Sequence, residues 1–152
     1  MIANLRILGL DIGSRIIGIA LSDPLALTAQ PVASMRRRSG LEEVIDQLVA
    51  VIAKTEAEEL VIGLPRHLDG RPGEQSIEAE KIGAMLADKT GVKVVYWDER
   101  LTTVMANRAL LEADISRKKR KRVIDKVAAV LILQNYLEYR RQRMAAESPQ
   151  QI

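Results

Sequence analysis

Residues 8–23 read LGLDIGSRIIGIALSD, and this stretch decides the fold because two apolar segments flank a short glycine-containing turn. The largely apolar run 5–10 predicts a buried strand that leads directly into Asp11. Beyond the turn at 13–14, large apolar residues alternate with small ones over 17–22, which is typical of a second strand. The pattern therefore predicts a β-hairpin with Asp11 in or beside its core.

The position of Asp11 admits two interpretations. An ionised carboxylate in a protein core is costly unless a compensating group accompanies it. Asp11 would then have a cation, a set of hydrogen-bond donors or a metal ion beside it. In the alternative, its side chain only caps the turn that follows.

Composition and length bound the class of protein. The 152 residues suffice for one domain with a substantial core, and we expect this domain to span 1–142, followed by a polar tail over 143–152. The absence of cysteine excludes disulfides and thiolate metal sites. No apolar run approaches the length of a membrane span, and the apolar N-terminal stretch ends without a signal-peptide cleavage pattern. We therefore expect a cytoplasmic protein with no membrane partner.

Positive charge is concentrated in one segment of the chain. The run Arg117, Lys118, Lys119, Arg120, Lys121 and Arg122 carries six charges, and without them the formal net charge of +3 would be −3. Such a patch on an otherwise acidic domain predicts a local contact with a polyanion. A solvated loop is the alternative interpretation. A smaller basic cluster occupies 36–38.

The remaining chain alternates between helical and strand patterns. Ser39 and Glu42 have the spacing of a capping box in front of an amphipathic helix over 41–55. The other expected elements are strands at 32–35, 60–64 and 92–97, a loop at 65–73, and helices at 74–89, 101–112 and 122–142. For the helix at 74–89 we expect Ile77, Ile82, Met85 and Leu86 to face inward. The basic run falls in the connection before the last helix, and the whole order predicts a mixed α/β sheet with helices on its faces.

Three carboxylates occupy positions that such a fold would bring together. Asp11 lies on the first strand, Glu99 follows the last strand, and Asp125 is on the apolar stripe of the last helix. Clusters of this kind bind Mg²⁺ or Mn²⁺, and two such ions can activate a water for phosphodiester hydrolysis. Zinc chemistry is poorly supported, since His67 is the one histidine in the chain. In the structural alternative, each acid is paired with a cation, as Asp125 would be with Lys126 or Arg122.

Four ordered motifs, which extend over about 5–140, resemble the YqgF family, RNase-H-like proteins described as Holliday-junction resolvases and as nucleases of the small-subunit rRNA precursor. The motifs are Gly9-Leu10-Asp11-Ile12-Gly13 with Gly18-Ile19-Ala20, Gly63-Leu64-Pro65 with Asp69-Gly70, Asp98-Glu99-Arg100-Leu101-Thr102-Thr103, and Asp125-Lys126-Val127-Ala128-Ala129 with Ile132-Leu133-Gln134. The resemblance implies an RNase H-like mixed five-stranded sheet, three antiparallel strands followed by two parallel ones, with helices on both faces. It also implies that Asp11, Glu99 and Asp125 are the catalytic triad, and by the carboxylate chemistry above we expect them to bind Mg²⁺ or Mn²⁺, as two ions.

Two further residues of these motifs are candidates for binding nucleic acid. His67 stands where the family commonly has Asn, and it either contacts a phosphate or assists proton transfer, or it is an exposed histidine without a role. Arg100 either contacts the scissile phosphate through its planar guanidinium or neutralises Asp98 or Glu99. The basic run 117–122 would hold the nucleic-acid backbone at the rim of the acidic site.

The function that follows is a metal-dependent endonuclease acting on structured nucleic acid. The resemblance favours processing of pre-16S rRNA, and resolution of branched DNA at Holliday junctions is the alternative. A non-catalytic ribosome-assembly factor that binds nucleic acid is a third interpretation. The Asp-x-Gly motif also resembles the phosphate loop of actin-like and sugar-kinase ATPases, but those proteins need two such domains. The oligomeric state, monomer or homodimer, stays open, because junction resolution would require a two-fold dimer and end trimming would not.

Overall fold

The computed structural model describes residues 5–38, 40–65, 69, 71, 73–101 and 117–147. For Leu101, for 117–126 and for Glu147 it describes the backbone alone. The elements are β1 (Ile7–Ile12), β2 (Ile16–Ser22), β3 (Ala29–Arg36), α1 (Leu41–Thr55), β4 (Glu59–Leu64), α2 (Glu74–Thr90), β5 (Lys93–Asp98), the 3-10 helix η1 (Glu99–Leu101) and α4 (Arg117–Glu147). The predicted helix over 101–112 lies outside the described residues, apart from its first position.

The five strands form one mixed sheet in the order β3-β2-β1-β4-β5. Strands β1, β2 and β3 are antiparallel neighbours, whereas β4 pairs parallel to β1 and β5 pairs parallel to β4. This arrangement confirms the predicted topology. The central strands β1 and β4 are buried at every position, which explains why their sequences are apolar except for Asp11 and Glu59. Strand β3 lies at one edge of the sheet and is largely exposed. Pro31 is tolerated there because an edge strand does not need every backbone N–H for pairing.

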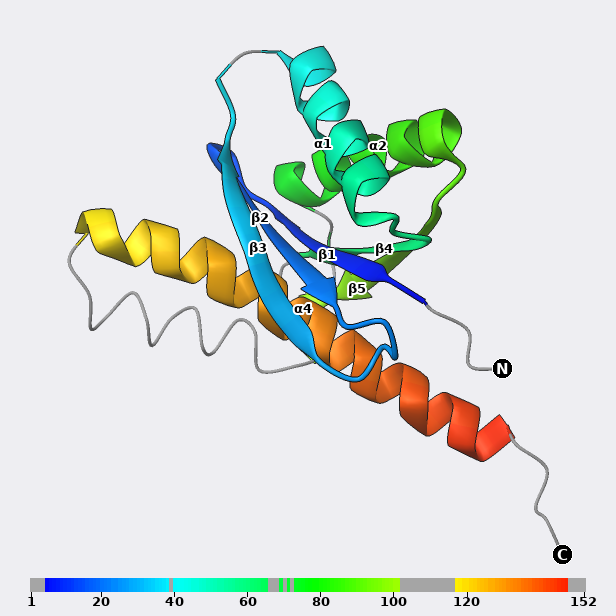
Figure 1. The fold of residues 1–152 in the computed structure, drawn as a ribbon. Coiled ribbons are helices and arrows are strands. Elements are labelled where there is room, and N and C mark those ends of the chain that lie inside the picture. The colour runs from blue at the N-terminus through cyan, green and yellow to red at the C-terminus, as the bar shows by residue number, and fades with distance from the viewer. Residues whose placement is uncertain are drawn as a thin grey trace, which may run out of the picture.

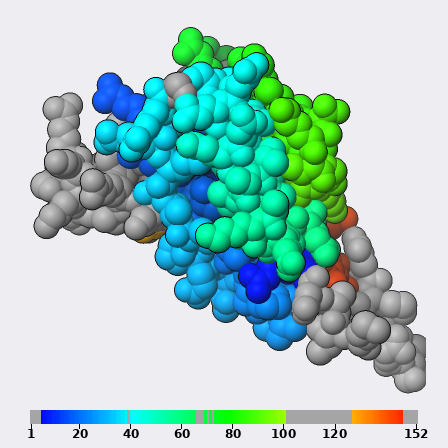
Figure 2. Space-filling model, turned by 45° about the horizontal axis from the view of Figure 1, so that its top comes forward, coloured from blue at the N-terminus to red at the C-terminus, as the bar shows by residue number. Residues whose placement is uncertain are grey.

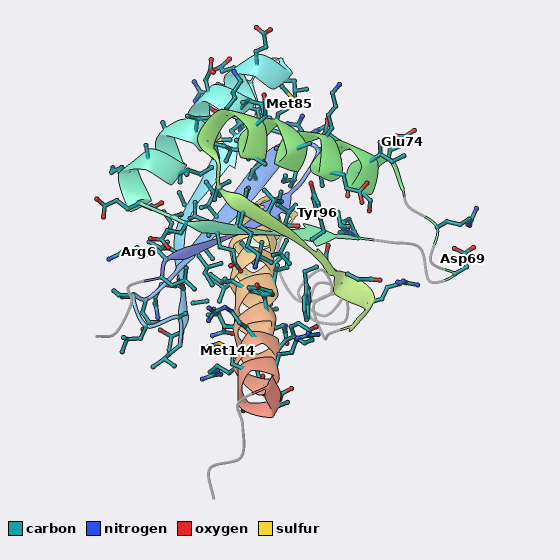
Figure 3. The ribbon with its side chains drawn as sticks, turned by 90° about the vertical axis from the view of Figure 1, so that its right-hand side faces the viewer. Arg6, Asp69, Glu74, Met85, Tyr96 and Met144 are labelled. Atoms are coloured by element: carbon teal, nitrogen blue, oxygen red, sulfur yellow. The ribbon has the colours of Figure 1, made fainter. Side chains whose placement is uncertain are left out.

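Helices cover both faces of the sheet (Figure 1). Helices α1 and α2 lie side by side over one face, as the cyan and green surfaces in Figure 2 show. The long helix α4 crosses the other face, so that the sheet is the middle layer in Figure 3. A hydrophobic core lies on each face of the sheet. The core under α1 and α2 includes Leu10, Ile45 and Ile82, and the core under α4 includes Val61, Ala129 and Ile132.

Helix α1 begins and ends at the predicted residues, but its predicted cap is wrong. The N-cap is Gly40, and no side chain caps the helix. Glu42 and Glu43 in the first turn interact favourably with the helix dipole.

Helix α2 also matches its predicted range within a residue and ends at Gly91 in the left-handed conformation. The predicted inward position of Ile77 is wrong, since that side chain is 59% exposed. Ser76 is buried instead, because its hydroxyl donates a hydrogen bond to the carbonyl of Pro65. In the first turn of the helix, the buried position is therefore Ser76, one residue before the predicted Ile77.

Helix α4 is longer at both ends than the sequence predicts. The basic run 117–122, predicted in a connection, forms its first turns, and residues 143–147 of the predicted tail form its last. The run 117–122 contains no apolar residue and the side chains of 143–146 are exposed, so the hydrophobic period that predicts 122–142 does not reach these segments. In the described part of the chain, no helix has the combined length and apolarity needed to cross a membrane.

Candidate active site

Asp11 is buried on the face of the sheet that α4 covers. Along β1, Leu8, Leu10 and Ile12 pack toward α1 and α2, so the alternating residues Gly9 and Asp11 face α4. Asp11 is 3% exposed and pairs across the hairpin with Gly18, which has no side chain to compete for the space. The hairpin predicted from residues 8–23 therefore carries its carboxylate into the core, as expected.

Glu99 enters the same face from the end of β5. It is the first residue of η1 and is fully buried, at 0% exposure. Its Oε2 lies 3.3 Å from the position that a Cβ on Gly63 would occupy, and Ile132 of α4 closes over the same point. The absence of a side chain at Gly63 thus leaves the space in which the Glu99 carboxylate sits.

The sheet register brings these two acids to one place. Strands β1 and β4 are parallel, with Leu10 beside Ile62, so the next residues along, Asp11 and Gly63, are neighbours about 5 Å apart. Glu99 reaches over Gly63 from the other side of β4. Two buried carboxylates therefore flank the end of one central strand, and the prediction that the fold places Asp11 near Glu99 is supported by this register.

Asp125 belongs to the helix that covers this corner. The carbonyl of Ala129 and the Cβ of Leu133 lie 3.1 and 2.8 Å from the Cβ position of Gly9. Tyr136 contacts Glu59 at the start of β4, and Ile132 covers Gly63 near its end, so α4 runs toward the strand ends as its residue numbers fall. Asp125 precedes Ala129 by one turn in that direction. Its side chain lies outside the described part of the chain, and its contacts stay a prediction.

The described side chains supply two candidate metal ligands at this corner, Asp11 and Glu99. Among the side chains that the structure describes, no group of three acids or histidines has the arrangement of a metal site. The donor set of Asp11 and Glu99, carboxylate oxygens in a confined and largely dry corner, is nevertheless the chemistry that hard divalent cations prefer. Burying two like charges side by side is also costly unless positive charge balances them. The residues present fit Mg²⁺ or Mn²⁺.

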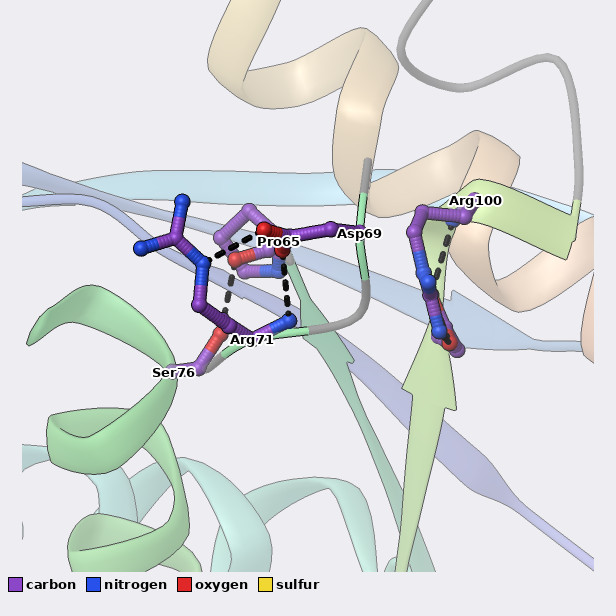
Figure 4. A network of polar contacts seen from close by, with 6 residues as sticks. Pro65, Asp69, Arg71, Ser76 and Arg100 are labelled. Carbon is purple, nitrogen blue, oxygen red and sulfur yellow. Dashed lines mark hydrogen bonds and ion pairs between the residues drawn. The ribbon is translucent and has the colours of Figure 1, made fainter. Parts of the chain in front are cut away.

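Arg100 is engaged by its neighbour Asp98. Its Nε lies 3.0 Å from Asp98 Oδ1 and its Nη2 lies 2.6 Å from Oδ2, a bidentate ion pair beside the loop of Asp69 (Figure 4). The hydrogen bonds that Arg100 donates to Asp98 raise the pKa of its guanidinium, and the carboxylate of Asp69 adds to the effect. Of the two predicted roles of Arg100, neutralisation of Asp98 is present in the structure, and contact with a phosphate stays a prediction.

The loop after β4 is described only in part. Asp69 accepts hydrogen bonds from the backbone N–H of Arg71 at 3.0 Å and from its Nε at 2.6 Å, and Ser76 ties the start of the loop at Pro65 (Figure 4). His67 lies outside the described residues, so its predicted role is untested. The side chains of 117–122 are also outside the described part, although their backbone is helical.

Three arginines near this edge were not identified as possible site components by the sequence analysis. Arg37 forms a bidentate ion pair with Glu78 at 2.5 and 3.1 Å and donates a hydrogen bond to the carbonyl of Gly13. Arg15 and Arg36 flank it at the tip of the β1–β2 hairpin. The available signal was the basic cluster 36–38, which follows a predicted strand of the same meander. Its relation to Asp11 depends on the strand register, which the sequence pattern does not specify.

Comparison with known proteins identifies the class of protein to which this chain belongs. A family described as "RuvX: Holliday junction resolvase" matches residues 5–139. The fold is similar to that of RuvC from Thermus thermophilus in complex with a Holliday junction substrate, with a TM-score of 0.57 at 12% identity over 91% of this chain and 96% of that one. A second Thermus thermophilus RuvC structure gives a TM-score of 0.54. The chain thus has an RNase H-like α/β fold.

The chain belongs to the RuvX family. A relative from Clostridium acetobutylicum is 50% identical over 133 residues, which cover 88% of this chain and 98% of the relative. Another, from Agathobacter rectalis, is 44% identical over 137 residues, which cover 89% and 96%. Both are named "Putative pre-16S rRNA nuclease". The comparisons bear out the predicted family resemblance, the fold class and the assignment as a nuclease, a hydrolase acting on nucleic acid.

Proposed function

We propose that this chain is a divalent-metal-dependent endonuclease that cleaves the precursor of 16S rRNA, with its active site at the ends of β1 and β5. The observation that carries the proposal is the burial of Asp11 and Glu99 on the two sides of Gly63. The names of the relatives support the choice of rRNA precursor. The family description favours branched DNA as the second candidate substrate.

In this proposal, Asp11, Glu99 and Asp125 hold one or two Mg²⁺ or Mn²⁺ ions. Such ions, when bound, lower the pKa of a coordinated water and stabilise charge on the oxygens of a scissile phosphodiester. The chain itself contributes the carboxylates, their burial on the face covered by α4, and a rigid strand register that sets their separation. Asp125 is included because its place on α4 leads toward the same strand ends.

Basic residues around this corner would hold the nucleic-acid backbone. The first turns of α4, which carry 117–122, extend toward the side of the sheet where the β1–β2 hairpin tip lies (Figure 1). We propose that these side chains, with His67 and Arg100, bind phosphates by charge and shape rather than by reading bases. Arg100 would exchange part of its ion pair with Asp98 for a phosphate oxygen, or contact both.

The test is cleavage of a pre-16S rRNA fragment and of a synthetic four-way DNA junction by the purified protein, with Mg²⁺, Mn²⁺ or EDTA. We expect metal-dependent cleavage, and we expect Asp11→Asn, Glu99→Gln and Asp125→Asn each to lower the rate by about 100-fold or more. Asp46→Asn, an exposed acid on α1, is the matched control and should cleave at the wild-type rate.

The pattern of losses separates the candidate functions. Cleavage of the rRNA fragment alone supports the proposal, and cleavage of the junction alone transfers the assignment to junction resolution. If neither substrate is cut, and the folded variants bind both as tightly as the wild type, the chain is a binding factor and the proposal is wrong.

A further inference from the structure

A hollow bounded by arginines lies at the tip of the β1–β2 hairpin. Its volume is about 420 Å³, and its lining residues are Arg15, Ile16, Arg36 and Arg37. Arg15 follows the hairpin turn, whereas Arg36 and Arg37 come from the end of β3, which pairs with the start of β2. Three guanidinium groups from two separate segments thus border one depression in the surface.

Arg37 has a structural role in this hollow, because its guanidinium is already bound to other groups of the protein. Its guanidinium is largely buried, is paired bidentately with Glu78 of α2, and donates to the carbonyl of Gly13 in the hairpin turn. Its backbone N–H also donates to the carbonyl of Arg15, at 2.8 Å. These contacts hold the hairpin tip, the end of β3 and α2 together, so the hollow has a fixed shape.

Arg15 and Arg36 are available for a ligand. Both side chains are exposed, and within the described part of the chain neither guanidinium has an ion pair or hydrogen bond to a side chain. Neighbouring cations repel one another in the free protein. A group carrying negative charge and several acceptor oxygens, such as a phosphodiester, would relieve that repulsion and use the planar donor geometry of both.

The strand register places this hollow beside the proposed active site. Met35 packs toward α1 and α2, so Arg36 lies on the same face of the sheet as Asp11. Asp11 pairs with Gly18, and Gly18 with Ser34, two residues before Arg36. Strand spacing and rise per residue then separate Arg36 from Asp11 by about 12 Å between backbones, a distance of a few nucleotides along a strand.

We propose that Arg15 and Arg36 form a phosphate-binding subsite that holds the backbone of the nucleic-acid substrate a few nucleotides from the bond cleaved at Asp11 and Glu99. This inference rests on the proposed function for its substrate class. It adds the hairpin tip as a positioning surface, distinct from the first turns of α4.

The experiment measures binding separately from cleavage. The Asp11→Asn protein in EDTA, with and without Arg15→Ala and Arg36→Ala together, is titrated with the rRNA fragment and with the four-way junction over a series of salt concentrations. Arg6→Ala is the matched control, because Arg6 precedes β1 at the opposite end of the strands from the hairpin tip. Figure 3 shows Arg6 on the opposite side of the molecule from the loop of Asp69. Thermal unfolding establishes that all variants are folded.

We expect the double substitution to weaken binding by about 10-fold or more at low salt. It should also reduce the slope of log Kd against log salt by between about one and two, because each arginine would contact one phosphate. Arg36→Lys should bind more tightly than Arg36→Ala but less tightly than the wild type, because lysine keeps the positive charge and loses the planar guanidinium. A Kd and a slope equal to those of Arg6→Ala would overturn the subsite. A second result would also overturn the subsite: inorganic phosphate competes more strongly than chloride at equal ionic strength, while the double variant keeps its affinity for nucleic acid. The hollow would then be a site for small anions.

The outcomes separate this inference from the proposed function. If the wild type cleaves with metal but the double variant binds like the control, the subsite is wrong and the nuclease assignment stands. If the double variant loses affinity but the wild type cleaves nothing, the subsite stands and the nuclease assignment is wrong.

Discussion

Two residues without side chains determine how the buried acids are accommodated. Gly9 lies under Ala129 and Leu133 of α4, and Gly63 lies under Ile132 and beside Glu99 Oε2. A Cβ at either position would occupy space that the helix or the carboxylate already uses. The glycines therefore set both the depth of α4 on the sheet and the room for Glu99, which links a packing requirement to the proposed chemistry.

Gly9→Ala should destabilise the protein by about 1–3 kcal/mol, because its new methyl group meets a Cβ at 2.8 Å and a backbone carbonyl at 3.1 Å that cannot rotate away. Urea unfolding measures the change. Gly40→Ala is the control, since nothing lies within 4 Å of that Cβ position, and its cost should stay below about 1 kcal/mol. Equal free energies of unfolding for the two variants would show that α4 is free to shift.

At the scale of elements, α4 is attached to the sheet by a buried polar contact as well as by its apolar stripe. The hydroxyl of Tyr136 donates a hydrogen bond to Glu59 at the start of β4, and Lys93 Nζ lies 3.8 Å from the same carboxylate. Burial and the adjacent Glu59 raise the pKa of the Tyr136 phenol, so it keeps its proton and remains a donor at neutral pH. Trp97 packs edge-on against the same tyrosine ring.

Tyr136→Phe should lower the free energy of unfolding by about 1–3 kcal/mol, because the buried Glu59 loses a donor. The matched control is Tyr139→Phe on the same helix, which removes an exposed hydroxyl that accepts from Arg143 and should cost less than about 1 kcal/mol. Chemical denaturation at pH 7 gives both values. The buried hydrogen bond would be energetically unimportant if the two substitutions were equivalent.

At the scale of the whole molecule, the ion pair of Arg37 with Glu78 joins the hairpin to the helical layer on the opposite face from α4. The hydrogen bond from Arg37 lowers the pKa of the Glu78 carboxyl and raises that of the Arg37 guanidinium. Because the folded-state pKa of Glu78 lies below its ordinary value of 4.5, the pair stabilises the fold above that pH. The contribution is lost as the pH falls through the lowered pKa.

Glu78→Gln should therefore reduce stability by about 1 kcal/mol or less at pH 7, since the Glu78 side chain is 40% exposed and partly screened. The difference from the wild type should shrink below pH 4.5, which urea unfolding at pH 7 and pH 3.5 measures. The matched control is Glu80→Gln on the same helix, because it removes an exposed charge that forms no ion pair within the described residues. A difference that persists at pH 3.5 would contradict the linkage.

Much of this architecture could be predicted because local patterns and the global fold agree. The apolar run before Asp11, the alternation after it and the stripe of α1 each specify an element from neighbouring residues alone. The start of α4 at Arg117 could not be predicted in this way. Six consecutive cations have no hydrophobic period, so the pattern indicates a loop although the backbone is helical.

The sequence patterns by themselves determined the strands and two of the helices, because period and turn residues depend on short-range chemistry, whereas the family resemblance supplied the sheet topology and the three candidate acids. Only the tertiary structure decided that Asp11 and Glu99 lie on the two sides of Gly63, that Tyr136 binds Glu59, and that Arg15 and Arg36 share a hollow. These contacts join residues distant along the chain, and their geometry depends on strand register and helix depth. Register and depth follow from the packing of all layers at once, which no local pattern contains.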